Sequence, residues 1–194
     1  RQHRITGAAY DELIEEFIAA AQEVFPGVLV QFEDFANHNA FRLLHKYRNR
    51  ICTFNDDIQG TGAVTLAGVL EACRRKGTKF TDERILIYGA GAGGIGVTWA
   101  LWMGLQREGL SPEEAASRIF VLDSKGLLTD DRPCEDYKKP YAQKRARISD
   151  WRFEGQNPNL LETIENARIT TLIGLSGQVG SFDEASVRAV AKNT

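Results

Sequence analysis

Apolar residues recur along this chain at two spacings that alternate from one segment to the next. Recurrence every three or four residues places side chains on one face of a helix, and it predicts helices at residues 10–25, 37–48, 60–75, 159–167 and 182–191. Short apolar runs predict strands at residues 28–32, 51–54, 84–88, 118–122 and 171–175. A glycine-rich run at residues 89–96 leads into one more helix, which reaches about residue 108. Strands that alternate with helices predict an α/β fold with a parallel sheet and right-handed crossovers.

Residues between these segments support the same boundaries. Pro26-Gly27 stops the first helix, whose apolar face is predicted to consist of Tyr10, Leu13, Ile14, Phe17, Ile18 and Ala21. Ser111, followed by Pro112 and two glutamates, marks the cap of an inserted helical piece near residues 107–116. Residues 129–150 are polar and contain prolines, so we expect an excursion over the surface.

Composition excludes some classes of protein. The 194 residues are 43% hydrophobic and 26% charged, which is ordinary for a globular chain and enough for one domain plus part of another. The net charge of -2 argues against a nucleic-acid or membrane-surface partner, and no apolar run approaches the roughly 20 residues that span a bilayer. The chain has three cysteines, Cys52, Cys73 and Cys134, an odd number without CxxC spacing. This pattern argues against a disulfide framework and against a zinc site, and it predicts that the protein resides in a reducing cytoplasm.

The glycine-rich run carries the clearest chemistry. Gly89, Gly91 and Gly94, with Ala90 after the first, match G-x-G-x-x-G directly after a predicted strand and before a predicted helix. The first glycine allows a tight turn, the second lets the backbone approach a pyrophosphate, and the third lets the helix pack on the strand. The helix N-terminus adds amide donors for the phosphates. The run therefore predicts a site for NAD or NADP, although such turns also serve packing alone.

An acidic residue follows at the end of the next predicted strand. Asp123 stands where a carboxylate that binds an adenosine ribose is expected, although it lies farther from the glycines than the usual roughly 20 residues. The inserted helical piece explains the excess. A carboxylate favours NAD because it repels a 2′-phosphate, but Ser124-Lys125 and Lys138-Lys139 follow, and a lysine there would neutralise a phosphate. NAD and NADP both stay open at this point.

Two acidic pairs, Glu33-Asp34 and Asp56-Asp57, stand at the ends of apolar segments. Three carboxylates gathered at strand ends suit Mg²⁺ or Mn²⁺ and leave positions open for a substrate. A metal there would bind a 2-hydroxy acid through its hydroxyl and carboxylate and polarise the carbonyl that forms. Taken alone, either pair is also explained by helix capping or by a solvated loop end.

The two acidic pairs lie in longer phrases that resemble the signature segments of malic enzymes. These phrases are QFEDFANHNA at residues 31–40 and CTFNDDIQGT at residues 52–61. The resemblance continues in order through the glycine run, VLDSKGLL at residues 121–128 and LIGLSGQ at residues 172–178, and so covers essentially the whole chain. It is strongest to the bacterial branch of the larger, eukaryote-like form.

This resemblance implies roles for individual residues. Glu33, Asp34 and Asp57 match ligands of Mg²⁺ or Mn²⁺, and Asp56 matches the acid that supports a catalytic lysine. Ser176 matches a residue of the turn that faces the nicotinamide side of the cofactor. Lys138 matches a position where lysine accompanies NADP preference. The full set expected at the cofactor is Asn37, Thr61, Gly89, Ala90, Gly91, Gly94, Asp123, Ser124, Lys138 and Ser176.

The activity that the resemblance implies is oxidative decarboxylation of (S)-malate to pyruvate and CO₂ with reduction of NAD or NADP, in a cytoplasmic homo-oligomer. In this family a tyrosine acts as general acid and a lysine as general base, and both precede the region matched here. An asparagine-containing segment that contacts the substrate follows this region. We therefore expect further sequence before Arg1 and after Thr194, and no turnover from this chain alone.

Residues 1–55 are interpreted as the C-terminal part of a substrate and metal domain, and residues 56–194 as a Rossmann-type, doubly wound domain truncated at its C-terminal end. Two other hypotheses stay open. A non-catalytic module that senses dinucleotides has no need of Asp57. A different Rossmann dehydrogenase without a metal has no use for Glu33, Asp34 and Asp57 together.

Overall fold

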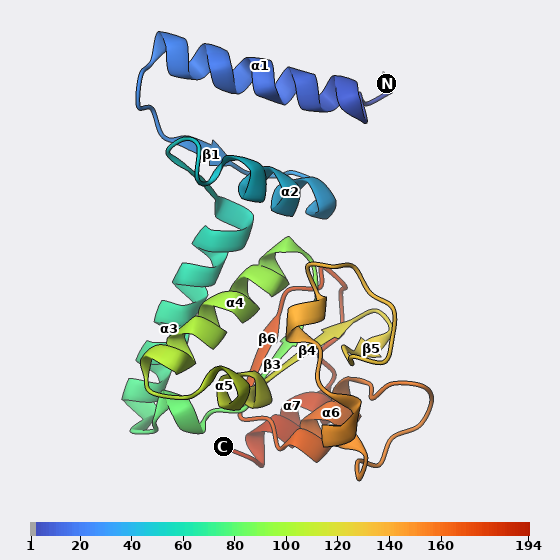
Figure 1. The fold of residues 1–194 in the computed structure, drawn as a ribbon. Helices are drawn as coiled ribbons and strands as arrows, with labels where there is room; N and C mark the ends of the chain where they lie inside the picture. Colours follow the sequence, from blue (N-terminus) through green and yellow to red (C-terminus); the bar gives the residue numbers. More distant parts are fainter. Residues whose placement is uncertain (1–2) are drawn as a thin grey trace.

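The small upper lobe of the molecule is built from the first quarter of the chain (Figure 1). The computed structural model describes residues 3–194. The upper lobe contains α1 (Ala8–Val24), β1 (Val30–Phe32), α2 (Asn37–Tyr47) and β2 (Thr53–Asn55). β1 and β2 form a parallel two-stranded sheet in which Val30 lies opposite Thr53. α1 and α2 cover this sheet through a core of Ile18, Val30, Phe32, Leu43 and Tyr47.

The predicted apolar face of α1 is only partly buried. Ile18 is 3% exposed and Ile14 packs beside it, but Leu13 is 49% exposed and Phe17 is 59% exposed.

A charged cluster ties α1 to α2. The Glu15 carboxylate accepts a hydrogen bond of 2.7 Å from the Tyr47 hydroxyl and forms ion pairs with Lys46 at 2.8 Å and Arg50 at 2.5 Å. The hydrogen bond from Arg50, followed by those from Lys46 and Tyr47, holds the pKa of Glu15 well below its ordinary value. Glu15 is therefore harder to protonate in the folded lobe than in an unfolded chain.

This cluster predicts an acid-sensitive contact. Glutamate in an unfolded chain titrates near about 4.3, so the contribution of Glu15 is complete above that pH and is lost as the pH falls toward the lower folded pKa. Glu15→Gln is expected to make the melting temperature less dependent on pH below about pH 5. Glu16→Gln is the matched control because Glu16 is exposed and lies next to Glu15. Equal acid sensitivity of both variants, measured by thermal unfolding from pH 3 to 7, would contradict the assignment.

A turn of π-helix connects the two lobes. It is η1 (Asp56–Gly60), and α3 (Thr61–Lys76) follows it without a break. The buried Asn55 caps η1, since its side-chain oxygen accepts a hydrogen bond of 2.9 Å from the Ile58 N–H. A Cβ on Gly96 would lie 2.1 Å from the Ile58 carbonyl oxygen, so η1 rests directly on the backbone of α4 (Ala92–Arg107). The helix predicted at residues 60–75 is confirmed as α3. The helix cap at Asn55 precedes η1 and not α3 itself.

The lower lobe is organised around a four-stranded sheet with the order β5-β4-β3-β6. β3 (Ile85–Tyr88) pairs in parallel with both β4 (Ile119–Asp123) and β6 (Thr171–Gly174), as predicted. β5 (Gly126–Leu127) runs antiparallel to β4 at one edge. The sequence did not predict β5, because two residues are too short to show a period.

Helices cover both faces of this sheet, which confirms the doubly wound α/β architecture. Residues that alternate along a strand point to opposite faces. Ile87 and Val121 therefore pack with α4 (Ala92–Arg107) and α5 (Pro112–Arg118). Leu86 and Phe120 pack on the other face, against α6 (Leu160–Ala167) and α7 (Glu184–Ala191). The remaining short helices are η2 (Phe80–Asp82), η3 (Lys139–Tyr141) and η4 (Arg145–Ile148).

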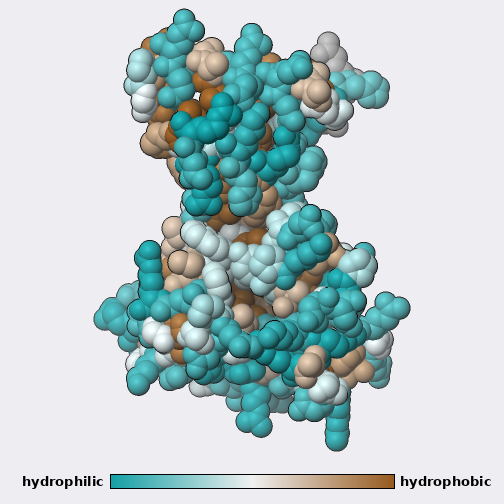
Figure 2. Space-filling model, viewed as in Figure 1, coloured by the Kyte–Doolittle hydropathy of each residue, from teal (hydrophilic) through white to brown (hydrophobic). Residues whose placement is uncertain are grey.

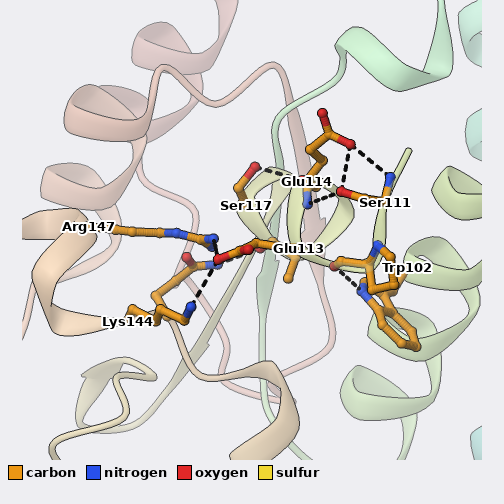
Figure 3. A network of polar contacts seen from close by, with 10 residues as sticks. Trp102, Ser111, Glu113, Glu114, Ser117, Lys144 and Arg147 are labelled. Atoms are coloured by element: carbon orange, nitrogen blue, oxygen red, sulfur yellow. Dashed lines mark hydrogen bonds and ion pairs between the residues drawn. The ribbon is translucent and has the colours of Figure 1, made fainter. Parts of the chain in front are cut away.

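The insertion before β4 contains the short helix α5, whose polar side chains form a network of hydrogen bonds (Figure 3). Ser111 and Glu114 form a reciprocal capping box at its start. Glu113 on the same helix accepts hydrogen bonds of 2.9 Å from Lys144 and 2.8 Å from Arg147. These bonds fix the excursion at residues 129–150, which is also held from inside by the buried side chain of Gln143. No helix within residues 3–194 combines the length and the apolar character that a membrane span requires.

Candidate functional site

A cleft of about 860 Å³ opens at the carboxyl ends of β3, β4 and β6. Chain order reverses there, because β4 lies on one side of β3 and β6 on the other. A reversal of this kind leaves a crevice beyond the strand ends, which is the usual ligand site of open α/β sheets. The upper lobe closes the far wall of the cleft with residues 34–37 and Asp57.

Two of the three glycines predicted for a dinucleotide, Gly89 and Gly94, occupy positions that exclude a side chain. Gly89 has φ +124°, and a Cβ there would lie 2.5 Å from the Leu175 carbonyl. A Cβ on Gly94 would lie 1.7 Å from the Gly89 carbonyl oxygen, so α4 packs directly on the end of β3. At Gly91 the nearest atom to such a Cβ is the Asn37 side chain at 3.3 Å, and this glycine faces the cleft. The cradle therefore fits a pyrophosphate.

Asn37 brings the upper lobe into contact with this cradle. Its side-chain oxygen accepts a hydrogen bond of 3.0 Å from the Ala92 N–H, in the first turn of α4. N–H groups at a helix start have no partner within the helix and are the groups that bind phosphate. Thr61, at the start of α3, lines the same part of the cleft. The two lobes thus meet where a dinucleotide phosphate is expected.

Asp123 ends β4 between two buried cations. Its carboxylate forms an ion pair of 2.8 Å with Arg132 and lies 3.7 Å from the Lys138 ammonium. The Lys125 N–H donates a further hydrogen bond of 2.8 Å to it. Arg132 was not predicted from the sequence, because it stands in an aperiodic loop where no pattern marks which side chain turns inward.

Lys138 is buried, and its charge is already matched. It forms an ion pair of 2.8 Å with Glu135 in addition to its contact with Asp123. Burial favours the neutral amine, but the hydrogen bond to Glu135 and the nearby charges of Glu135 and Asp123 together outweigh it and raise the pKa of Lys138. The same bond lowers the pKa of Glu135. Lys138 is therefore a charged group with two carboxylate neighbours in the folded protein.

The predicted metal ligands are only partly brought together. Asp34 and Asp57 both line the cleft, and the Asp57 carboxylate accepts a hydrogen bond of 2.8 Å from the Asp34 N–H. Asp34 has φ +60°, a conformation that is rare for residues other than glycine. Glu33 accepts a hydrogen bond of 2.7 Å from Gln31 and does not line the cleft. Within residues 3–194 no three side chains of His, Cys, Asp or Glu gather closely enough to hold a metal ion.

Two family models match this chain. The one described as "Malic enzyme, NAD binding domain" matches residues 58–194, and the one described as "Malic enzyme, N-terminal domain" matches residues 1–48. The chain belongs to the malic enzyme family. It is 45% identical over all 194 residues to the NAD-dependent malic enzyme of Proteus mirabilis and 47% identical over 189 residues to that of Edwardsiella ictaluri. It spans about a third of these relatives, 34% of each.

Solved malic enzyme structures show the same fold. The malic enzyme of Entamoeba histolytica superposes with a TM-score of 0.67 over 92% of this chain and 35% of that one, at 23% identity. The NAD-dependent malic enzyme of Thermotoga maritima superposes with a TM-score of 0.66 over 92% of this chain and 50% of that one, at 21% identity. These likenesses confirm the Rossmann-type α/β fold.

Most residues that the malic enzyme resemblance marked share the one cleft. They are Asp34, Asn37, Asp57, Thr61, Gly89, Ala90, Gly91, Asp123, Ser124, Lys138 and Ser176. Gly94 lies beneath the cradle, and Glu33 lies outside the cleft. Asp56 also lies outside it, with its side chain folded back over Gly60. The roles of these residues stay predictions. The cleft is also lined by Arg4, Tyr88, Glu135, Tyr137 and Gln178, for which no role was predicted.

Proposed function

We propose that the complete gene product carrying this chain converts malate to pyruvate and CO₂ and transfers the hydride to NAD. The observation that carries the proposal is one cleft that joins a glycine cradle for a dinucleotide with the carboxylates of Asp34 and Asp57. Neither a simple nucleotide sensor nor a metal-free dehydrogenase has a use for both. The similarity to NAD-dependent malic enzymes supports the same reaction.

The chain's own residues would position the cofactor. The turn from Gly89 to Gly91 and the start of α4 face the pyrophosphate, and Asp123 faces the adenosine ribose. Ser176, after β6, lies on the opposite flank of the cleft and faces the nicotinamide side. Asn37 and Thr61 close the cleft from the lobe junction. This arrangement leads the dinucleotide along the strand ends toward the two aspartates, where malate is expected.

Asp34 and Asp57 suit a hard divalent cation, because both offer carboxylate oxygens to the cleft. We propose them as ligands of Mg²⁺ or Mn²⁺, with Glu33 as the third once it gives up its bond to Gln31. Such a cation, when bound, supplies a Lewis acid for the negative charge that loss of CO₂ leaves on oxygen. Asp56 remains proposed as a supporting acid, although its side chain folds over Gly60 here. The general acid and base are expected in parts of the polypeptide outside this chain.

NAD is the proposed cofactor rather than NADP. Lys138 stands near the ribose position, but Glu135 and Asp123 already balance its charge. A 2′-phosphate at this place would bring two negative charges beside Asp123 without gaining a free cation. The boundary between a substrate domain and a cofactor domain is proposed between residues 55 and 56, which lie in the stretch 49–57 that neither family model covers. We propose that the complete gene product is cytoplasmic and forms a homo-oligomer. Light scattering, which measures the molar mass in solution, tests the oligomeric state.

The balance around Lys138 predicts a change in cofactor preference. Glu135→Gln removes one of its two carboxylate partners and leaves positive charge for a 2′-phosphate. The ratio of kcat/KM for NADP to that for NAD is expected to rise about tenfold, equivalent to roughly 1.4 kcal/mol. Glu154→Gln is the control, since Glu154 is exposed and remote from the cleft. An unchanged ratio would show that Lys138 does not reach the cofactor.

The reaction itself is tested with the complete gene product, L-malate and Mn²⁺, with NAD and NADP assayed separately. Formation of the reduced cofactor is followed by absorbance, and pyruvate is quantified in parallel. Pyruvate formed in step with NADH supports the proposal. NADPH in its place would overturn the cofactor assignment alone. Cofactor binding without malate-dependent reduction would overturn the reaction and favour a dinucleotide-sensing module.

A further inference from the structure

A second groove, of about 700 Å³, lies between the two lobes and is separate from the strand-end cleft. Its walls come from α2, η1, α4 and the loop at residues 135–141. Figure 2 shows hydrophobic side chains at the narrow waist between the lobes. The volume lies within the usual range of about 300–1,000 Å³ for small-molecule sites. No step of the proposed reaction uses this groove.

The walls of the groove are rich in flat aromatic rings. Phe41 of α2 stacks on Tyr137 of the loop, with ring centroids 4.5 Å apart and planes at 13°. Trp99 of α4 lines the groove and is 38% exposed. Burial raises the pKa of Tyr141 to about 12, so this side chain is an uncharged ring near neutral pH. Aromatic walls of this kind favour a planar ring by stacking.

Most charges at the rim of the groove are already paired. Arg42 forms an ion pair of 2.7 Å with Asp11. The two acidic groups are matched by lysines outside the groove, since Glu135 pairs with Lys138 and Asp136 pairs with Lys139.

The unmatched groups at the rim are basic. Arg48 is exposed at the end of α2 and takes part in no ion pair among residues 3–194. His38 and His45 stand on the same helix and line the same groove. A guanidinium with free donors beside two imidazoles favours a carboxylate or phosphate. The rim therefore complements a negative ligand.

We propose that this groove binds a planar aromatic anion, with the ring between the aromatic walls and the negative group at Arg48. The shared chemistry is a flat ring system that bears one carboxylate or phosphate. Tyr137 and Glu135 line both the groove and the strand-end cleft. A ligand that displaces Tyr137 therefore moves the loop that carries Lys138, beside Asp123. Occupancy of the groove is thus coupled to dinucleotide affinity, and this coupling rests on the cofactor role proposed above.

Binding is tested by titration calorimetry on the complete gene product, with 2-naphthoate and 2-naphthyl phosphate as separate probes. Saturable binding of either probe is expected, and the two arms distinguish a carboxylate from a phosphate source. Arg48→Gln is expected to weaken binding about tenfold by removing a charged hydrogen bond. Arg107→Gln is the matched control, because Arg107 is an exposed arginine remote from the groove. His45→Trp blocks the groove from the exposed face of α2 and is expected to abolish binding.

Coupling is tested by repeating the titrations with saturating NAD. The dissociation constant of the probe is expected to change by about fivefold, and the probe must change that of NAD by the same factor. Absence of saturable binding would overturn the proposal, as would binding that Arg48→Gln and His45→Trp leave unchanged. An unaltered affinity in the presence of bound NAD would overturn the coupling. None of these readouts requires turnover, so failure of the proposed reaction is recognised separately.

Discussion

Replacement of Gly94 by alanine is expected to weaken dinucleotide binding at least tenfold and to lower the free energy of unfolding by about 3 kcal/mol or more. The added Cβ would stand 1.7 Å from the Gly89 carbonyl oxygen, where only backbone is available to move. α4 must then shift away from the end of β3. This shift displaces the first-turn N–H groups that a pyrophosphate would meet, so stability and binding fall together.

The control for this prediction is another glycine in a helix. A Cβ added to Gly68 of α3 would have no atom within 4 Å, so Gly68→Ala adds a side chain without a clash. It is expected to raise the free energy of unfolding by about 0.5–1 kcal/mol, because alanine restricts the unfolded chain more than glycine does. Urea unfolding followed by tryptophan fluorescence, with calorimetric titration of NAD, measures both effects. Native stability and affinity in Gly94→Ala would disprove the close packing of α4 on β3.

Replacement of Asp57 by asparagine is expected to reduce metal-dependent malate turnover about 10³-fold, since loss of a metal removes several kcal/mol of transition-state stabilisation. Asparagine keeps an oxygen that accepts the Asp34 N–H, and so retains the contact that supports the rare backbone conformation of Asp34. The loop is therefore expected to keep its shape while the site loses a charged ligand. Affinity for NAD is expected to remain that of the unaltered protein.

Two comparisons separate the metal role of Asp57 from a structural one. Asp57→Ala removes the acceptor as well as the charge, and it is expected to lower stability in addition to turnover. Asp82→Asn removes an exposed carboxylate from η2, outside the cleft, and should leave both quantities unchanged. Turnover and Mn²⁺ dependence are measured by pyruvate formation, and stability by urea unfolding. Undiminished Mn²⁺-dependent turnover in Asp57→Asn would contradict the ligand assignment.

Features encoded by a short stretch of sequence were predictable. The apolar runs at residues 84–88 and 118–122 predicted strands, and β3 places Leu86 and Ile87 in opposite cores. The glycine spacing after β3 predicted the turn and the helix start. Ser111 predicted the cap of α5. In each case the decisive contacts lie within a few residues, so local pattern and local geometry agree.

Features that depend on contacts between segments far apart in the sequence were not predictable. Nothing in the sequence indicated that Arg132 would turn toward Asp123, because irregular loops have no period that reveals side-chain direction.

The sequence by itself determined the order of strands and helices, the dinucleotide turn and, through two acidic phrases, the resemblance to malic enzymes. Only the tertiary structure decided that Asp34 meets Asp57 while Glu33 turns toward Gln31, and that Lys138 is balanced by Glu135 and Asp123. The physical reason is the distance along the sequence between the residues that interact. Turns and helix starts are set by neighbouring residues, whereas the charge balance of a site depends on side chains brought together across the sheet ends by packing.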